Sequence, residues 1–473
     1  MRVSRSHIPV LALVGLVLLC LAPPVAASDW SQYQRDARNT GAGEVAEAVG
    51  AWSHRLDGQA SSPATPFGEP ILVGDGSGVL HALAPADGEE LWRRSFESAL
   101  IAAPVTADDS LYVVEGRGVL HAMGRNGTER WRFRLANVTG STPAVSDDTV
   151  YAASVERLVA VKRATGAARW NRSLADVLLA SPTLAGDTVF VGTTETPSSV
   201  GEDTDVDGWL TAYAADDGER RWRVSTPGVI GVPAVAGEVV VVATTEGVVA
   251  LDRRDGSRRW NASLDATGLS TPVVANGTVV VGSQGGALHG LDVGSGHTSW
   301  TVTADDAFTI APAVSDGDVY AAGRGGSLHV IDLGSGRQRW RAELGGTVVP
   351  TAVTALDGAA VVGVGDRVLT LRNGSSPGRI EDGGRRPTTP EGDAVAGGED
   401  LGASDDDGEV TSDPQTDGAS ETSRDSGLRD APRPSAGEDG GNDASRSPSI
   451  LVPFAAAVGI AIALTAVYLG RLE

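Results

Sequence analysis

The sequence predicts an all-β fold: an eight-bladed β-propeller of four-stranded blades, followed by a disordered acidic stalk and a C-terminal transmembrane helix. The main observation is a set of eight tryptophans separated by 38 to 40 residues, with one gap of 52: Trp52, Trp92, Trp131, Trp170, Trp222, Trp260, Trp300 and Trp340. A period near 40 suits either a four-stranded blade or a helical repeat. The residues between the tryptophans distinguish the two.

Those intervening segments carry the pattern of strands and tight turns. A glycine, usually after Asp, Asn, Thr or Ser, stands four residues before every tryptophan except Trp52. This glycine supplies the positive φ of a hairpin turn. Upstream of it, apolar and polar residues alternate, as in 79–83 and 287–291. A proline opens each unit: Pro63, Pro104, Pro143, Pro182, Pro233, Pro272, Pro312 and Pro350. Four strands per unit, repeated eight times, fit a closed ring.

The two ends of the repeat region predict how the ring closes. The turn Asn373-Gly374 of the eighth unit is followed four residues later by Gly378 instead of Trp, whereas Trp52 has no complete unit before it. We therefore expect residues 51–54 to form the outer strand of blade eight, which removes the exposed edges. All eight tryptophans are expected to be structural, each packing against the neighbouring blade.

The repeat ending Leu-x-Ala-x-Asp-x-x-x-Gly-x-x-x-Trp resembles that of pyrroloquinoline quinone (PQQ)-type propellers. The segments 249–260 and 328–340 match it closely, and the lead-in 29–41 is similar to the usual start of such proteins. The resemblance covers roughly residues 29–375. Relatives include quinoprotein alcohol dehydrogenases and the non-enzymatic propeller lipoprotein of the bacterial outer-membrane barrel assembly machinery, so the repeat implies the fold and does not imply the cofactor.

The ends of the chain predict export and membrane anchoring. A basic start, an apolar run and a small-residue cleavage site indicate a secretory signal peptide, whereas Cys20, the only cysteine, offers an alternative lipoprotein site after an unfavourable leucine. A late stretch of 21 uncharged, mostly apolar residues is long enough to span a bilayer. The predicted divisions are signal peptide 1–27, propeller 28–375, acidic disordered linker 376–448, transmembrane helix 449–470 and cytoplasmic tail 471–473.

Composition and charge limit the kinds of molecule that the protein is expected to bind. The net charge is −23 and Lys162 is the only lysine, a composition that resembles exported haloarchaeal proteins and suits high salt. No basic stripe exists, which argues against nucleic-acid binding. The linker carries 18 acidic and 7 basic residues and few apolar ones, so it is expected to be disordered.

Two groups of surface positions are candidate sites. The long interval before Trp222 contains an insertion with Asp203, Asp205 and Asp207 in an Asp-x-Asp-x-Asp-Gly run, which suits calcium, although the twelfth position is Ala214 instead of Glu. An acidic halophilic loop is the alternative. Six Asn-x-Ser/Thr sequons on expected exposed turns are glycosylation candidates: Asn126, Asn137, Asn171, Asn261, Asn276 and Asn373.

Histidines recur at equivalent third-strand positions in four units: His81, His121, His289 and His329. We attribute them to inheritance of the repeat and not to a metal cluster. The resemblance to dehydrogenases would require a catalytic Asp, a calcium ion held by Glu and Asn, and often a Cys pair, and the chain without its leader has no cysteine.

No catalytic residue, PQQ or other cofactor is therefore expected, with calcium as the one possible ion. The sequence favours a non-catalytic scaffold, anchored in the cell membrane by one helix, that binds surface or secreted proteins through an extracellular propeller. The alternatives are a PQQ-dependent dehydrogenase and a structural cell-envelope glycoprotein.

Overall fold

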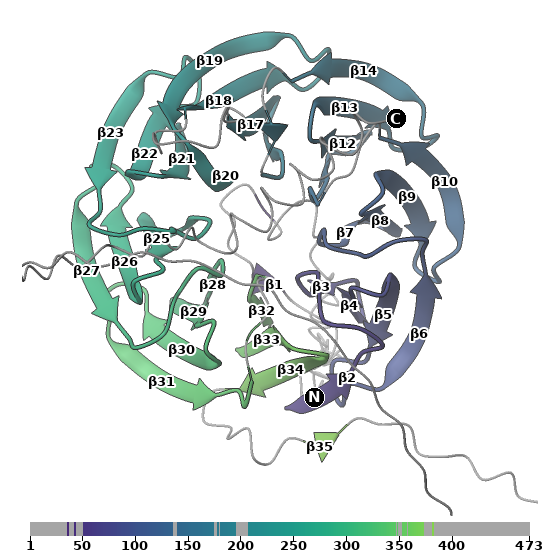
Figure 1. The fold of residues 1–473 in the computed structure, drawn as a ribbon. Helices are drawn as coiled ribbons and strands as arrows, with labels where there is room; N and C mark the ends of the chain where they lie inside the picture. The colour runs from purple at the N-terminus through teal and green to yellow at the C-terminus, as the bar shows by residue number, and fades with distance from the viewer. Residues whose placement is uncertain are drawn as a thin grey trace, which may run out of the picture. The chain divides into compact units, whose positions relative to one another are not determined.

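The computed structural model describes residues 36, 42–43, 51–135, 140–174, 177–178, 180–194, 207–346, 348, 352–356, 358–372 and 381–382, all in one compact unit of the chain. These residues form eight antiparallel sheets arranged as a closed ring (Figure 1), which confirms the predicted eight-bladed propeller. Each blade has its first strand nearest the centre and its last strand at the rim. The described part of the chain contains strands and turns and no helix.

Blades one to four follow the chain order from the centre outward. Their strands are β3 (Thr65–Pro66), β4 (Ile71–Gly74), β5 (Val79–Leu83) and β6 (Glu90–Ser95); β7 (Val105–Ala107), β8 (Ser110–Glu115), β9 (Val119–Gly124) and β10 (Glu129–Arg134); β11 (Ala144–Val145), β12 (Thr149–Ser154), β13 (Arg157–Lys162) and β14 (Ala168–Ser173); and β16 (Thr183–Ala185), β17 (Thr188–Thr194), β18 (Asp207–Ala214) and β19 (Arg220–Pro227). A short strand, β15 (Val177–Leu178), adds to blade four by pairing with β17.

Blades five to seven repeat the pattern, and blade eight is completed by segments from both ends of the repeat region. The strands are β20 (Val229–Ala236), β21 (Val239–Thr244), β22 (Gly247–Asp252) and β23 (Arg258–Ser263); β24 (Val273–Ala275), β25 (Thr278–Gly282), β26 (Ala287–Asp292) and β27 (Thr298–Thr303); β28 (Ala313–Ser315), β29 (Asp318–Ala322), β30 (Ser327–Asp332) and β31 (Gln338–Glu343); and β32 (Thr354–Leu356), β33 (Ala359–Val364), β34 (Arg367–Arg372) and β2 (Trp52–Arg55), flanked by β1 (Ala42–Gly43) and β35 (Glu381–Asp382).

Ring closure joins the outermost strand of blade eight to the preceding one. The strand β2 pairs antiparallel with β34, with Ser53 opposite Leu369 and Arg55 opposite Arg367. The backbone N–H of Trp52 also donates to the hydroxyl of Thr370 at 3.0 Å. The borrowed strand is therefore where the sequence predicts it, and β34 has no free edge.

Burial follows the position of a strand within its blade. The second and third strands are buried on both faces, as in β8 and β12, because neighbouring blades cover them. The outer strands alternate between half-buried or buried and exposed residues, as in β6 and β10. In seven blades a bulge lies one residue before the tryptophan of the outer strand, so that the indole turns toward the next blade.

For seven of the eight tryptophans, from Trp52 to Trp300, the glycine of the tight turn in the following blade lies against the indole ring. An added Cβ at Gly88 would lie 2.5 Å from the Trp52 ring, and the turn glycines Gly166 and Gly218 stand in the same relation to Trp131 and Trp170. For six tryptophans the indole N–H also donates to a main-chain carbonyl of the next blade; the pairs are Trp52–Pro85, Trp131–Arg163, Trp170–Ala215, Trp222–Arg253, Trp260–Val293 and Trp300–Leu333. One residue thus fills the space between blades and orients them.

The two ends of the blades differ in loop length. At one end lie short turns, such as those at Asn276-Gly277 and Asp316-Gly317, together with the Gly turns beside the tryptophans. At the other end the chain crosses from the outer strands to the next inner strands, in most blades through longer connections such as 96–104, 264–272 and 304–312; only Gly228 separates β19 from β20. Strand alternation places the β17–β18 connection at that same end. We call this end the long-loop face.

Candidate functional site

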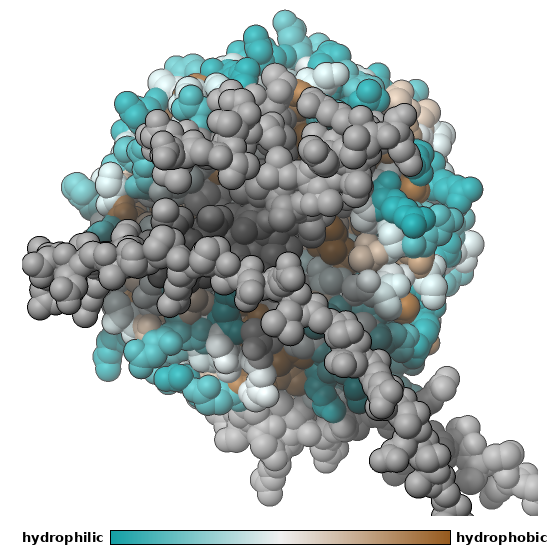
Figure 2. All heavy atoms as spheres, in the orientation of Figure 1, coloured by the Kyte–Doolittle hydropathy of each residue, from teal (hydrophilic) through white to brown (hydrophobic). Residues whose placement is uncertain are grey.

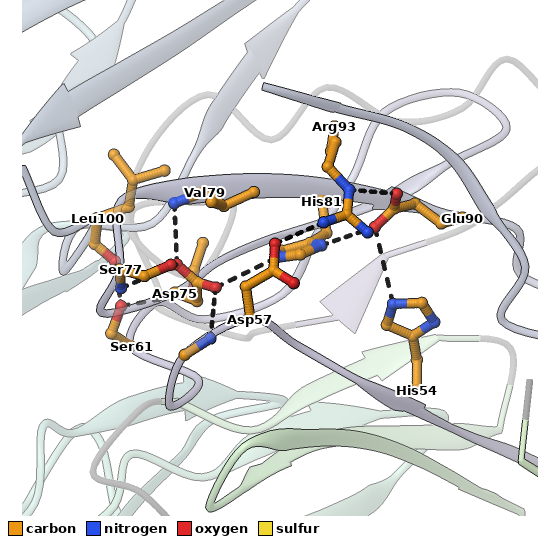
Figure 3. A network of polar contacts seen from close by, with 12 residues as sticks. His54, Asp57, Ser61, Asp75, Ser77, Val79, His81, Glu90, Arg93 and Leu100 are labelled. Atoms are coloured by element: carbon orange, nitrogen blue, oxygen red, sulfur yellow. Dashed lines mark hydrogen bonds and ion pairs between the residues drawn. The ribbon is translucent and has the colours of Figure 1, made fainter. Parts of the chain in front are cut away.

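A cluster of ionisable side chains lies where blade eight meets blade one (Figure 3). It contains His54 from β2, His81 from β5 and Glu90 from β6, and one nitrogen or oxygen atom of each lies within 4.8 Å of the others. Among the described residues, these three side chains are the one group of histidine, cysteine or acidic residues placed so that it could hold a metal ion. We refer to it as the seam cluster.

Asp75 fixes the orientation of His81. The carboxylate accepts hydrogen bonds from the backbone N–H groups of Gly58, Ser77 and Val79 at 2.9 to 3.0 Å, and its Oδ2 lies 3.2 Å from Nε2 of His81. Burial disfavours the charged carboxylate, but the bonds from His81 and the backbone outweigh it and lower the pKa of Asp75 to about 2. His81 and Asp75 are both fully buried.

Glu90 joins the two histidines. Its Oε2 lies 2.9 Å from Nδ1 of His81 and 3.8 Å from Nε2 of His54. Burial alone would lower the pKa of His81, but the hydrogen bonds to Asp75 and Glu90 outweigh it, so the pKa is raised. His81 thus lies between two carboxylates, those of Asp75 and Glu90.

His54 is held in one tautomer by the main chain. Its Nδ1 lies 3.0 Å from the carbonyl oxygen of Gly88, and because a carbonyl only accepts, this nitrogen carries the proton. Burial, with the charge of His81 adding to it, lowers the pKa of His54. Its other nitrogen, Nε2, lies 3.8 Å from Oε2 of Glu90.

Arg93 and Asp57 cover the solvent side of the cluster. The Nε of Arg93 donates to Oε1 of Glu90 at 2.6 Å, and its guanidinium also pairs with Asp57. Arg93 and Asp57 are about half exposed, whereas the side chains of His54 and Glu90 are 10% and 19% exposed. The cluster is accordingly dry on the inside and reachable from one side.

The next seam, between blades one and two, carries a similar arrangement, with Glu115 in place of Asp75 and Arg94 in place of His54. There His121 lies between Glu115 and Glu129, at 3.4 and 2.8 Å. Arg94 takes the place of His54: its guanidinium donates to the carbonyl oxygen of Gly127 and lies 3.6 Å from Glu129. A pocket of about 590 Å³ opens beside this group.

Comparison with known proteins identifies the family. A family model described as outer membrane protein assembly factor BamB matches residues 38–124, 116–204 and 206–420. The chain belongs to the BamB family. No curated protein sequence matches this BamB-family chain.

Solved structures share the fold at low sequence identity. BamB from Moraxella catarrhalis has a TM-score of 0.55 and 18% identity, covering 67% of this chain and 97% of that one. The quinohemoprotein alcohol dehydrogenase from Comamonas testosteroni has a TM-score of 0.57 and 14% identity, covering 74% and 81%. A computationally designed protein, Ika8, gives 0.58 and 17%, covering 68% and 100%. BamB and a dehydrogenase are thus both similar to this chain in fold.

The inner strands of this BamB-family propeller do not fit the quinone site that the dehydrogenase resemblance implies. In the described structure, β3, β7, β11, β16, β20, β24, β28 and β32 carry no ionisable side chain, and so offer no carboxylate for calcium or proton transfer. Instead, inner-strand hydroxyls bind neighbouring blades: Thr65 donates to Pro104 at 2.8 Å, and Thr354 to Ala64 at 2.9 Å. The expectation of no cofactor stays a prediction for reconstitution to test.

The predicted calcium residues fall in and beside the insertion. Asp203 and Asp205 lie outside the described residues, and Asp207 is exposed at the first position of β18. The strand β18 therefore begins at the last of the three aspartates. Calcium binding stays a prediction.

Four of the six sequons can be placed. Asn126 and Asn276 are exposed in turns, as expected, whereas Asn137 and Asn373 lie outside the described residues. Asn171 and Asn261 are exposed but lie within the outer strands β14 and β23, so their expected turn position is wrong. Both side chains point outward because they follow a buried tryptophan by one residue on an alternating strand.

The four repeat histidines lie on the third strands β5, β9, β26 and β30, as the sequence predicts, each in a different blade. Sequence reasoning missed the partners of His81. The signal was available: once Trp52 is assigned to the outer strand of blade eight, His54 lies two residues further on the same face, beside Gly88 and Glu90.

The described residues include no helix long and apolar enough to cross a membrane. The predicted signal peptide, the membrane span at 449–470 and nearly all of the acidic linker lie outside the described residues.

Proposed function

We propose that this BamB-family propeller is a non-catalytic scaffold that binds another surface or secreted protein through its long-loop face. In this proposal the ring lies outside the cell, and residues 449–470 anchor it as a single-pass protein of the cell membrane. Family membership and the propeller fold support a role in protein interaction.

We choose this face because the two ends of the blades differ in loop length. The opposite end is closed by tight turns whose geometry is set by glycines and by contact with the tryptophans. The long-loop face has connections of about twice that length, free to vary while the strands hold their ends. Ile101, in the connection after β6, is 40% exposed there and contacts Gly140 of the next connection.

The distribution of exposed apolar residues agrees with binding at a specific part of the surface and not with general adhesion. The rim in Figure 2 is mainly hydrophilic, with apolar residues in separate places. Among the described residues, only Leu91, at the outer rim, and Ile101 are large exposed hydrophobic side chains. Ile101 is the one of these two that lies on the long-loop face, so it serves as the marker of that face in the test below.

Affinity capture of the full chain from native membranes in high salt, followed by mass spectrometry, tests the proposal. We compare the parent with Ile101→Asp on the long-loop face and Leu91→Asp on the rim as a matched control. The proposal expects one partner with the parent and with Leu91→Asp, and its loss with Ile101→Asp. Retention with Ile101→Asp and loss with Leu91→Asp would overturn the choice of face.

A separate measurement addresses the dehydrogenase alternative. The purified chain is reconstituted with quinone and calcium, and absorbance and dye-linked alcohol oxidation are recorded. The scaffold proposal expects neither a bound quinone spectrum nor turnover above that of quinone alone. Stoichiometric quinone binding with turnover would replace it.

A further inference from the structure

We propose that the seam cluster is a binding site for one divalent transition-metal ion of the zinc class, which links the borrowed strand β2 of blade eight to blade one. The ligands are Nε2 of His54, Nδ1 of His81 and Oε2 of Glu90. Two imidazoles and one carboxylate form a known zinc ligand set that leaves a fourth position for water.

Both histidines already have the supporting contacts that metal ligands need. A ligating imidazole usually donates its other N–H to a carboxylate or a backbone carbonyl, which fixes the ring and the tautomer. Here Nδ1 of His54 donates to Gly88, and Nε2 of His81 faces Asp75. The remaining nitrogen of each ring faces Glu90 (Figure 3).

The spacing fits with small adjustment. Ligand atoms around a tetrahedral zinc ion at about 2.0–2.1 Å are roughly 3.3 Å from one another. The observed distances from Oε2 of Glu90 are 2.9 Å to His81 and 3.8 Å to His54, on either side of that value. On binding, Nδ1 of His81 releases its proton to solvent and forms the bond to the metal, as metal ligation requires.

Charge also favours a divalent cation. Asp57, Asp75, Glu90 and Arg93 leave a charge of −2 when both imidazoles are neutral, and the ion cancels it. Arg93 does not compete for the ligand atom, because its Nε bonds to Oε1 of Glu90 and leaves Oε2 free for the metal. A hydrogen-bonded second carboxylate oxygen is the usual arrangement of a ligating Glu.

The seam between blades one and two shows which group occupies the equivalent position there. At the seam between blades one and two, the positive charge comes from a side chain of the protein. The Arg94 guanidinium donates to the carbonyl oxygen of Gly127 and pairs with Glu129. His54 makes the same turn contact with an imidazole at the seam between blades eight and one. The metal takes the place of the Arg94 guanidinium at that seam.

The test is isothermal titration of Zn²⁺ into the full chain, purified in detergent without a polyhistidine tag and stripped with a chelator. Thermal unfolding is measured with and without the ion, and Co²⁺ serves as a spectroscopic probe of tetrahedral ligands. We expect one equivalent of Zn²⁺ to bind and to raise the Tm. Absence of one-to-one binding by the parent would overturn the proposal.

Variants separate the site from surface histidines and from misfolding. His54→Asn and Glu90→Gln should lose binding by at least about tenfold, whereas His121→Asn in the next seam should bind like the parent. His54→Arg should bind no zinc yet melt at or above the Tm of the metal-free parent, because arginine fills this position at the next seam. Zinc binding by His54→Arg or Glu90→Gln at parent affinity would refute the assignment.

Discussion

The indole nitrogen of Trp52 donates a hydrogen bond of 2.7 Å to the carbonyl oxygen of Pro85, across the junction of the last blade and the first. Trp52 is 1% exposed and lies in the core cluster that also contains Leu83 and Val361. This side chain of the borrowed strand β2 therefore packs blade eight against blade one.

Removing this side chain should weaken the whole ring. We expect Trp52→Ala to lower the free energy of unfolding by about 3–5 kcal/mol, because a large buried ring and its cavity are involved. The half-buried Trp92 is the control, and Trp92→Ala should cost less. Denaturant unfolding monitored by far-UV circular dichroism measures both, and equal costs would contradict the special role of the seam between blades eight and one.

The Gly88 turn should tolerate no side chain. Its φ is +74°, and a Cβ there would lie 2.5 Å from the Trp52 ring. Gly88→Ala thus combines left-handed backbone strain of about 1–2 kcal/mol with a clash of about 1–3 kcal/mol. Gly277, with φ of +79° and nothing near its Cβ position, isolates the strain. We expect Gly88→Ala to lower the Tm more than Gly277→Ala; the reverse order would show that the turn does not press on the indole.

Stability should fall at alkaline pH through Tyr320, which is 2% exposed in β29. Burial, with Asp318 and Asp316 adding to it and Arg339 opposing it, raises the pKa of Tyr320 to about 12. The unfolded chain releases the phenolic proton near about 10, so this stabilisation is complete below that pH and is lost as pH rises toward 12. A shift of this size corresponds to at most about 2–3 kcal/mol. Tyr320→Phe should flatten the decline between pH 10 and 12 in urea unfolding; an unchanged slope would assign the decline to other groups.

The insertion of blade four should bind calcium if its three aspartates converge. We expect isothermal titration of the full chain with Ca²⁺ to show binding that is lost when Asp203, Asp205 and Asp207 are all replaced by Asn, because the amide oxygens carry no charge. The Glu90→Gln variant is the control, since it lies in another blade. Identical titrations of the parent and the triple variant would leave the loop as an acidic, halophilic surface.

The sequence predicted the ring because its determinants are local and periodic. The Trp and Gly positions recur at one spacing, and Trp52 without a unit before it identifies the borrowed strand. The short strands β1, β15 and β35 were not predicted, because pairs of residues such as Ala42 and Gly43 carry no readable period. The seam cluster was missed because it joins His54 to a carbonyl 34 residues away, across blades. Such a contact appears only when the repeats are superposed in three dimensions.

Closure by β2 also makes the position of the chain ends arbitrary. Trp52 enters the ring bonded to Thr370, two residues before β34 ends at Arg372, so the start and finish of the propeller lie side by side. A short linker between them, with new termini in the open turn at Gly277, would give a circular permutant with the same blades in the same order. In that molecule all strands of blade eight would be consecutive, as the strands of the other blades already are.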